Sequence, residues 1–173
     1  GGQHWTPIRG QSSAPIDSDR LIAVDVDRGV THLKPLPRVL TVSVIEQALT
    51  ILMAGRAADE LLTGMANSGA GGGIPSDLGQ ATVLSAARRM SFGLGDTLSF
   101  RGTVQEALAL LETDAKLKAE VEQDLQDAYD VTLSLLSRNV MALRALASEL
   151  ALRRFMRAEE MVAFVASHPE AQS

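Results

Sequence analysis

One aspartate in the sequence stands where a metal ligand would suit its surroundings. The stretch "GIPSDLGQAT" (residues 73–82) sets a proline, a serine and Asp77 directly before a helical pattern. A carboxylate in the first turn of a helix lies in the favourable field of the N-terminal dipole, and nearby glycines allow close backbone approach. On this pattern alone, Asp77 is either an ordinary first-turn acid or one ligand of a metal site completed from elsewhere.

Histidines are the other potential zinc ligands, because the sequence contains no cysteine and therefore no disulfide, zinc–thiolate site or cysteine nucleophile. Only His4, His32 and His168 are present, and no HExxH motif occurs. Two histidines one helical turn apart bring both imidazoles to one metal, which His4 cannot do alone. His32 lies in a predicted strand and His168 in the C-terminal tail, so neither is expected to bind metal. The sequence also lacks a P-loop and a GxSxG nucleophile elbow.

Composition indicates a helical domain. The 173 residues suffice for one domain with a core, and 46% are hydrophobic against 21% charged. Aromatic residues make up only 3%, so Ala, Leu, Val and Met must build the core, which favours closely packed helices over a large sheet. The formal charge of −5 gives no electrostatic reason to expect a nucleic-acid partner. No apolar run has the length of a membrane span, and no signal peptide is recognisable.

Strand patterns are confined to the N-terminal side. Residues 1–20 have no sustained period and are expected to form an irregular arm. "LIAVDV" (21–26) and "GVTHL" (29–33) predict a β-hairpin that turns at Asp27 and Arg28, and no other strand is predicted. "KPLPRVL" follows as a connector, because its two prolines exclude a helix interior.

Helical patterns occupy the rest of the chain. Ser43 and Glu46 have capping-box spacing at the start of a helix that ends at Gly64, and Ser76 is the expected N-cap of the next helix. Apolar residues at helical spacing predict two further long helices as an antiparallel pair with a break near Asn139, then a short closing helix. The expected fold is mainly α, a helical bundle with a small β-hairpin. It forms one domain over residues 21–173, with strands in 21–33, core helices in 43–91 and a C-terminal helical pair in 114–166.

Three ordered motifs carry a resemblance to a known family. They are "ILMAGRAADELLTG", "SGAGGGIPSDLGQATVLSAARRM" and "FGLGDTLSF". They resemble the patterns LxGGRAAEExxxG, TTGAxxDLxxAT and ARxMVxxxGMS of the peptidase domain of FtsH-type membrane-bound AAA+ zinc metalloproteases. The closing helical segments are also similar, so the resemblance covers about residues 29–166, the large majority of the chain.

The resemblance implies roles for particular residues. In that family, the two histidines of HExxH and one aspartate bind zinc, and the HExxH glutamate is the general base for the attacking water. Asp77 falls on the aspartate ligand position, whereas the histidines and the glutamate have no counterpart here. "GVTHL" resembles the strand beside the family's cleft, so Gly29, Val30 and Thr31 are expected to bind a peptide that adds as an extra strand. A plain hairpin strand is the alternative.

Two functions remain open at this point. In the first, the chain is the C-terminal part of an ATP-dependent zinc metalloendopeptidase domain that degrades unfolded proteins. The resemblance then implies an AAA+ ATPase module, a homo-hexamer and a cytoplasmic location, with the HExxH helix upstream of this sequence. In the second, it is a degenerate pseudopeptidase that serves as an oligomerisation or protein-interaction module. In both cases the isolated chain is expected to be inactive and free of zinc, because one carboxylate does not hold the metal.

Overall fold

The computed structural model describes residues 21–26, 30–66 and 68–168. Six α-helices, two short 3-10 helices and three strands occupy this part of the chain. Their bounds are β1 Leu21–Asp25, β2 Val30–Leu33, α1 Val42–Thr63, η2 Ser68–Ala70, α2 Asp77–Met90, η3 Val104–Glu106, α3 Ala107–Thr113, α4 Ala115–Arg138, α5 Val140–Arg153, β3 Phe155–Arg157 and α6 Ala158–Ala166. The mainly helical fold predicted from the sequence is confirmed. None of the helices in these ranges has the length and apolar character that a membrane span requires.

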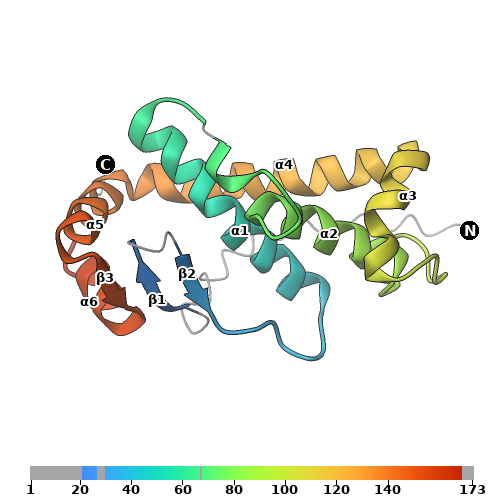
Figure 1. Cartoon of the computed structure of the whole chain (residues 1–173), viewed down its shortest axis with the longest axis horizontal. Coiled ribbons are helices and arrows are strands. Elements are labelled where there is room, and N and C mark those ends of the chain that lie inside the picture. Colours follow the sequence, from blue (N-terminus) through green and yellow to red (C-terminus); the bar gives the residue numbers. More distant parts are fainter. Residues whose placement is uncertain (1–20, 27–29, 67, 169–173) are drawn as a thin grey trace, which may run out of the picture.

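The helices α1 to α4 form the main core. Figure 1 shows α4 running alongside α1, with α2 and α3 packed against them, and α1, α2 and α4 contact one another directly. One cluster of buried side chains joins the three helices, with Leu49 of α1, Ala81 of α2 and Ala128 of α4 among its members. A second joins α2, α3 and α4 through Met90 and Leu117. Small residues at these contacts let the helix backbones approach closely. This packing agrees with the low aromatic content, which leaves few large side chains to fill the core.

The predicted antiparallel pairing of the two N-terminal strands is confirmed, and the structure adds a strand to them; the turn predicted at Asp27 and Arg28 lies outside the described residues. β1 pairs antiparallel with β2, so that Val24 lies opposite Thr31. β1 also pairs antiparallel with β3, with Val24 opposite Met156, giving the strand order β2-β1-β3. The prediction of no further strand was therefore wrong. It failed because residues 155–157 gain their strand partner only when the C-terminal segment folds back onto β1.

Helix ends differ from the sequence-based expectation at two places. The N-cap of α1 is Thr41, whose hydroxyl accepts a hydrogen bond from the amide of Val44 at 3.3 Å, so the capping box predicted at Ser43 is wrong. α5 ends at Arg153 because Arg154 adopts a left-handed conformation with φ 64°, although the helical pattern runs on to Phe155. The ends at Gly64 (φ 77°) and Ser76 are as predicted.

The C-terminal helices are arranged differently from the predicted antiparallel pair. The main neighbour of α4 is α1, and α5 turns away from α4 after the break at Asn139. In Figure 1, α5 and α6 lie with the sheet at one end of the molecule. η3 and α3 were not predicted at all. The short segment that forms them gains its helical conformation by packing on α2 and α4.

Candidate functional site

Asp77 is the first residue of α2, and the preceding serine fixes the start of that helix. Ser76 has extended backbone angles, and its hydroxyl accepts a hydrogen bond from the amide of Gly79 at 3.2 Å. The amide of Ser76 in turn donates to the carbonyl oxygen of Gly73 at 3.0 Å. Capping and loop closure together hold the Asp77 backbone at the positive end of the helix dipole.

The side chain of Asp77 faces α1. A Cβ atom built on Gly55 would lie 3.8 Å from Asp77 Oδ2, so the carboxylate sits beside the glycine of the "AGRAADE" stretch. Asp77 as a residue is exposed, but partial burial of its carboxylate raises its pKa above the ordinary value. Partial desolvation disfavours the charged form of this carboxylate, and a cation bound beside it would offset that cost.

The glycine-rich loop rests directly on α2 at Gly79. A Cβ atom on Gly79 would lie 2.8 Å from both Cα and the carbonyl oxygen of Ile74, and it would also collide with the carbonyl oxygen of Gly73. The side-chain amide of Gln80 donates to the carbonyl oxygen of Pro75 at 2.9 Å and ties the loop to the same helix. Only glycine at position 79 therefore allows the loop to take this path.

Substitution of Gly79 tests this contact. Replacing a helical glycine with alanine normally stabilises a protein by about 0.5–1 kcal/mol. We expect Gly79→Ala instead to lower the free energy of unfolding by about 1–3 kcal/mol, because backbone atoms of the loop must move. Urea unfolding followed by circular dichroism measures the difference.

Gly55→Ala is the matched control, because its new methyl group would meet Asp77 Oδ2 only at 3.8 Å, an ordinary contact. We expect it to be neutral or stabilising. Equal effects of the two substitutions would contradict the close approach at Gly79.

The predicted peptide-binding residues lie on a sheet edge. Val30 and Thr31 belong to β2, which among the described strands pairs with β1 alone and is therefore an outer strand. An outer strand has backbone amide and carbonyl groups available to a further strand. Gly29, the third residue of this prediction, and His4 lie outside the described residues.

A groove lies beside the end of β2. Its volume is about 440 Å³, and its walls come from the chain leaving β2, from α1, from α2 and from the glycine-rich loop. Most lining side chains are apolar, among them Leu33, Ile51 and Leu84; Lys34 and Gln80 are the polar members. Asp77 lies one helical turn before Gln80. The arrangement offers an apolar surface next to a strand edge.

His32 and His168, the two histidines in the described part of the chain, lie in β2 and at the end of α6. His32 is in β2, where it pairs with Ala23. His168 stacks on Phe164 at a ring-centroid distance of 4.5 Å and donates from Nδ1 to the Phe164 carbonyl oxygen at 2.9 Å, so it closes α6. Within residues 21–26, 30–66 and 68–168, no three His, Asp or Glu side chains gather as a metal-binding group.

The structure contains a largely buried cluster of charged and polar side chains that the sequence did not predict. Arg89 of α2 forms a two-pronged ion pair with Asp124 of α4, with Nη2 2.9 Å from Oδ1, and both side chains are largely buried. The fully buried Ser85 donates to Asp124 Oδ2 at 2.6 Å. Ser85 and Arg89 are one helical turn apart on an otherwise apolar face, which indicates that they share a polar partner. The sequence alone did not identify that partner as Asp124.

Glu60 of α1 forms a contact with a neighbouring helix. Glu60 accepts a hydrogen bond from the hydroxyl of Tyr129 in α4. This bond raises the pKa of Tyr129, because it stabilises the protonated phenol beside a carboxylate. Glu60 therefore joins α1 to α4 and has a structural role.

Comparison with known proteins relates the chain to zinc metalloproteases. No family model matches it. It is 29% identical over 156 residues to the ATP-dependent zinc metalloprotease FtsH of Magnetococcus marinus, covering 82% of this chain and 23% of that protein. It is 30% identical over 162 residues to FtsH 1 of Sorangium cellulosum, covering 85% of this chain and 26% of that protein. The YME1 homolog of Schizosaccharomyces pombe is 36% identical over 114 residues, covering 65% of this chain and 16% of that protein.

These matches extend over most of the chain but only about a quarter or less of each relative. They support the resemblance drawn from the three motifs. The chain is thus related, over most of its length, to the FtsH and YME1 zinc metalloproteases.

Proposed function

We propose that this chain is the C-terminal part of the peptidase domain of an ATP-dependent zinc metalloendopeptidase, with Asp77 as one zinc ligand. The observation that carries the proposal is the placement of Asp77. Its partly desolvated carboxylate lies at the start of α2, beside Gly55 of α1, in a chain related to zinc metalloproteases. The two segments that meet here, "AGRAADE" and "SDLGQAT", are the ones that resemble the family motifs.

The described residues do not fit a complete zinc site. A zinc site needs three or more protein donors, and Asp77 is a single carboxylate with no histidine or second acid gathered around it in the described part of the chain. The remaining ligands and the general base must come from outside these residues. This chain's own contribution is to hold one oxygen donor in position through the Ser76 cap and the loop on Gly79.

The outer strand β2 is proposed to bind the substrate backbone. An extended segment of an unfolded protein would add to its free edge at Val30 and Thr31, where main-chain hydrogen bonds accept any sequence. Gly29, just before the strand, is included in the proposal. The apolar groove that begins at Leu33 would receive side chains of the same segment.

The remaining partners are proposed from the family resemblance and from the ATP dependence of the relatives. They are ATP-dependent proteases, so we propose that an AAA+ ATPase module of the full-length protein delivers unfolded substrate to this domain, in a homo-hexamer on the cytoplasmic side of a membrane. The alternative, a degenerate pseudopeptidase with interaction or assembly as its role, is favoured by the lack of a gathered ligand set in the described ranges.

Zinc content tests the proposal. We expect this chain alone to contain no stoichiometric zinc, and the product of the full coding region, including sequence upstream of Gly1, to contain one zinc per chain. In that longer protein, Asp77→Ala should weaken zinc binding by more than the roughly 10–100-fold that loss of an outer-shell partner costs. Elemental analysis during dialysis against a competing chelator measures the loss.

Asp127→Ala is the control, because it removes an exposed carboxylate of α4 far along the chain. Equal zinc retention in the Asp77 and Asp127 variants would contradict the ligand role. A longer protein that binds no zinc and cleaves no unfolded substrate would favour the pseudopeptidase.

A further inference from the structure

The described residues pack as two unequal parts. The first, here called the helical body, consists of α1, α2, α3 and α4 with the intervening loops and contains both buried clusters. The second, here called the sheet lobe, consists of the three strands with α5 and α6. Of the apolar residues whose burial the structure describes, Ala23, Ala142 and Met156 are the buried ones in the sheet lobe. Figure 1 shows the lobe at one end of the molecule, next to the ends of α1 and α4.

The two parts share little packing. Within the described ranges, the main contacts between them are those of α5 with α1 and with α4, and neither buried cluster crosses the boundary. Within the lobe, by contrast, β1 pairs with both other strands, and α6 packs on β1 and β3. Two units that are well packed internally but share only a small interface are expected to move relative to one another.

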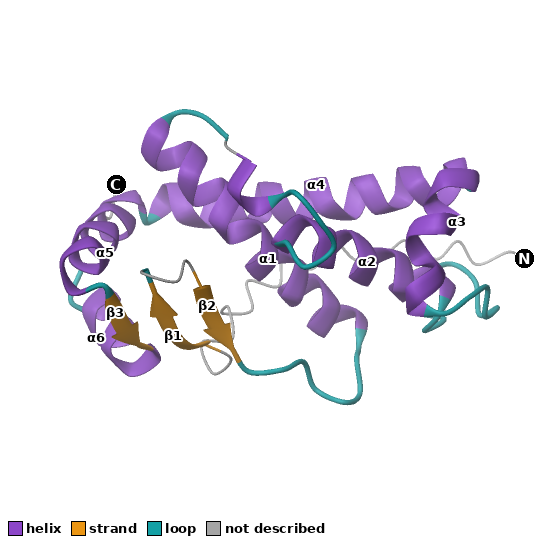
Figure 2. Cartoon of the chain, in the orientation of Figure 1, coloured by secondary structure: helices purple, strands orange, loops and turns teal. Residues whose placement is uncertain are grey.

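Two connections link the parts, and both can act as hinges. Residues 34–41 run between β2 and α1 without helix or strand (Figure 2), and Val39 in this segment is 78% exposed. Between α4 and α5, Asn139 has φ −110° and ψ 23°, which interrupts the helical path. Hinges are commonly a few loop or element-terminal residues that absorb backbone rotation, and both connections are of this kind.

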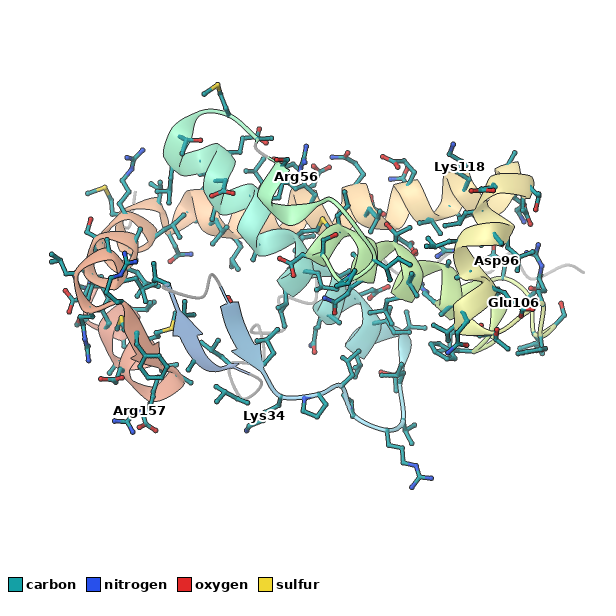
Figure 3. All side chains as sticks on the ribbon, viewed as in Figure 1. Lys34, Arg56, Asp96, Glu106, Lys118 and Arg157 are labelled. Atoms are coloured by element: carbon teal, nitrogen blue, oxygen red, sulfur yellow. The ribbon has the colours of Figure 1, made fainter. Side chains whose placement is uncertain are left out.

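The apolar groove straddles the boundary. Leu33 to Leu36 form the wall on the side of the lobe and its connection, with Lys34 shown at the foot of β2 in Figure 3. Ile51 of α1 and Leu84 of α2 stand on the side of the helical body. Leu33 is the one lining residue that belongs to a strand of the lobe, so a rotation of the lobe would shift Leu33 and the adjoining connection against the helical body.

We infer that the sheet lobe is a hinged jaw that opens and closes against the helical body about residues 34–41 and Asn139. β2 belongs to the jaw and Asp77 to the body, so the rotation also sets the distance between the strand edge and Asp77. The importance of that distance for peptide cleavage rests on the proposed function. The motion itself does not depend on it.

Spin-label distance measurements on this chain test the inference. Because the sequence has no cysteine, two introduced cysteines are the only labelled sites. Lys118 and Arg157 project at opposite ends of the molecule (Figure 3), and Ala163, exposed on α6 near Arg157, is a lobe site that carries no ion pair. The reporter is Lys118→Cys with Ala163→Cys.

Two control pairs report on the parts themselves. Ser43→Cys with Lys118→Cys lies within the helical body, and Ala151→Cys with Ala163→Cys lies within the lobe; all these positions are exposed. We expect the distance distribution between the parts to be at least about twice as broad as either control. A second form of the reporter carries Pro35→Gly and Pro37→Gly. These substitutions make residues 34–41 more flexible and should broaden only the distance distribution between the two parts.

The hinge proposal would be contradicted if the distance distribution between the two parts were as narrow as those of the control pairs and did not change in the double-glycine form. Such a result would leave the zinc proposal untouched, because the labels report no metal. Failure of zinc binding in the longer protein would likewise leave the hinge measurement standing.

Discussion

Asp124→Ala is expected to lower the free energy of unfolding by about 3–5 kcal/mol, the largest effect of any single substitution considered for this chain. Removing the carboxylate takes away the bidentate partner of the Arg89 guanidinium, whose side chain is only 17% exposed, and leaves Glu120, 3.3 Å from Nε, as its remaining ion-pair partner. It also leaves the hydroxyl of Ser85, which is fully buried, without its acceptor. Arg88 loses a carboxylate at 3.7 Å as well. Urea unfolding at neutral pH measures the change.

The control for Asp124 is the exposed Lys116, which forms an ion pair on the same helix. Lys116 Nζ lies 3.3 Å from Glu120 Oε1, and the Lys116 side chain is 75% exposed. Solvent screens such a pair, so Lys116→Ala should cost at most about 1 kcal/mol. A loss at Asp124 no larger than the loss at Lys116 would mean that the buried cluster does not hold α2 on α4.

The same residue should make stability depend on acid pH. Burial acts to raise the pKa of Asp124, but hydrogen bonds from Arg89 and Ser85 outweigh it and leave the pKa below its ordinary value. The unfolded chain therefore binds a proton at Asp124 more readily than the folded chain does. The stabilising contribution is complete above about pH 5 and is lost as the pH falls through the folded-state pKa. Asp124→Asn, which cannot titrate, should show a flatter loss of stability in this range than the parent protein.

Leu49→Ala is expected to have the second-largest effect, a loss of about 2–5 kcal/mol in the free energy of unfolding. Leu49 is 1% exposed and packs with Ile45, Met53, Ala81 and Ala128, so three helices meet at its side chain. Truncation removes apolar contacts and leaves a cavity among short neighbours that cannot fill it. Thermal unfolding by calorimetry gives the difference.

Leu98→Ala makes the same chemical change on the surface. Leu98 lies in the loop after α2 and is 92% exposed, so its truncation should change stability by no more than about 0.5 kcal/mol. Similar losses at the two leucines would show that Leu49 is not a core residue.

Local patterns were sufficient for much of the fold. The pairing of β1 with β2, the stop at Gly64 and the cap at Ser76 depend on residues within a few positions of one another, and each was predicted. The N-cap of α1 shows the limit of such patterns, because both Thr41 and Ser43 can cap and the hydrogen bond to the amide of Val44 is formed by Thr41.

For the candidate site, the sequence singled out Asp77 and the strand residues Val30 and Thr31 but not their surroundings. That Asp77 faces Gly55, and that Gly79 must be glycine, depends on how the loop and α1 pack on α2. The ion pair of Arg89 with Asp124 could not be predicted from the sequence, because 35 residues separate the two partners in the chain.

The sequence by itself determined the helical class of this protein, the end of α1 at Gly64, the start of α2 at Ser76 and the relation to the zinc metalloproteases, since these follow from composition, short-range spacing and motifs. Only the tertiary structure decided that β3 joins the sheet, that α4 packs on α1 rather than beside α5, and that a groove lies between the chain leaving β2 and the helical body. The physical reason is that strand pairing, helix packing and buried ion pairs join residues far apart in the chain, and their partners are chosen by the burial that the whole fold makes possible.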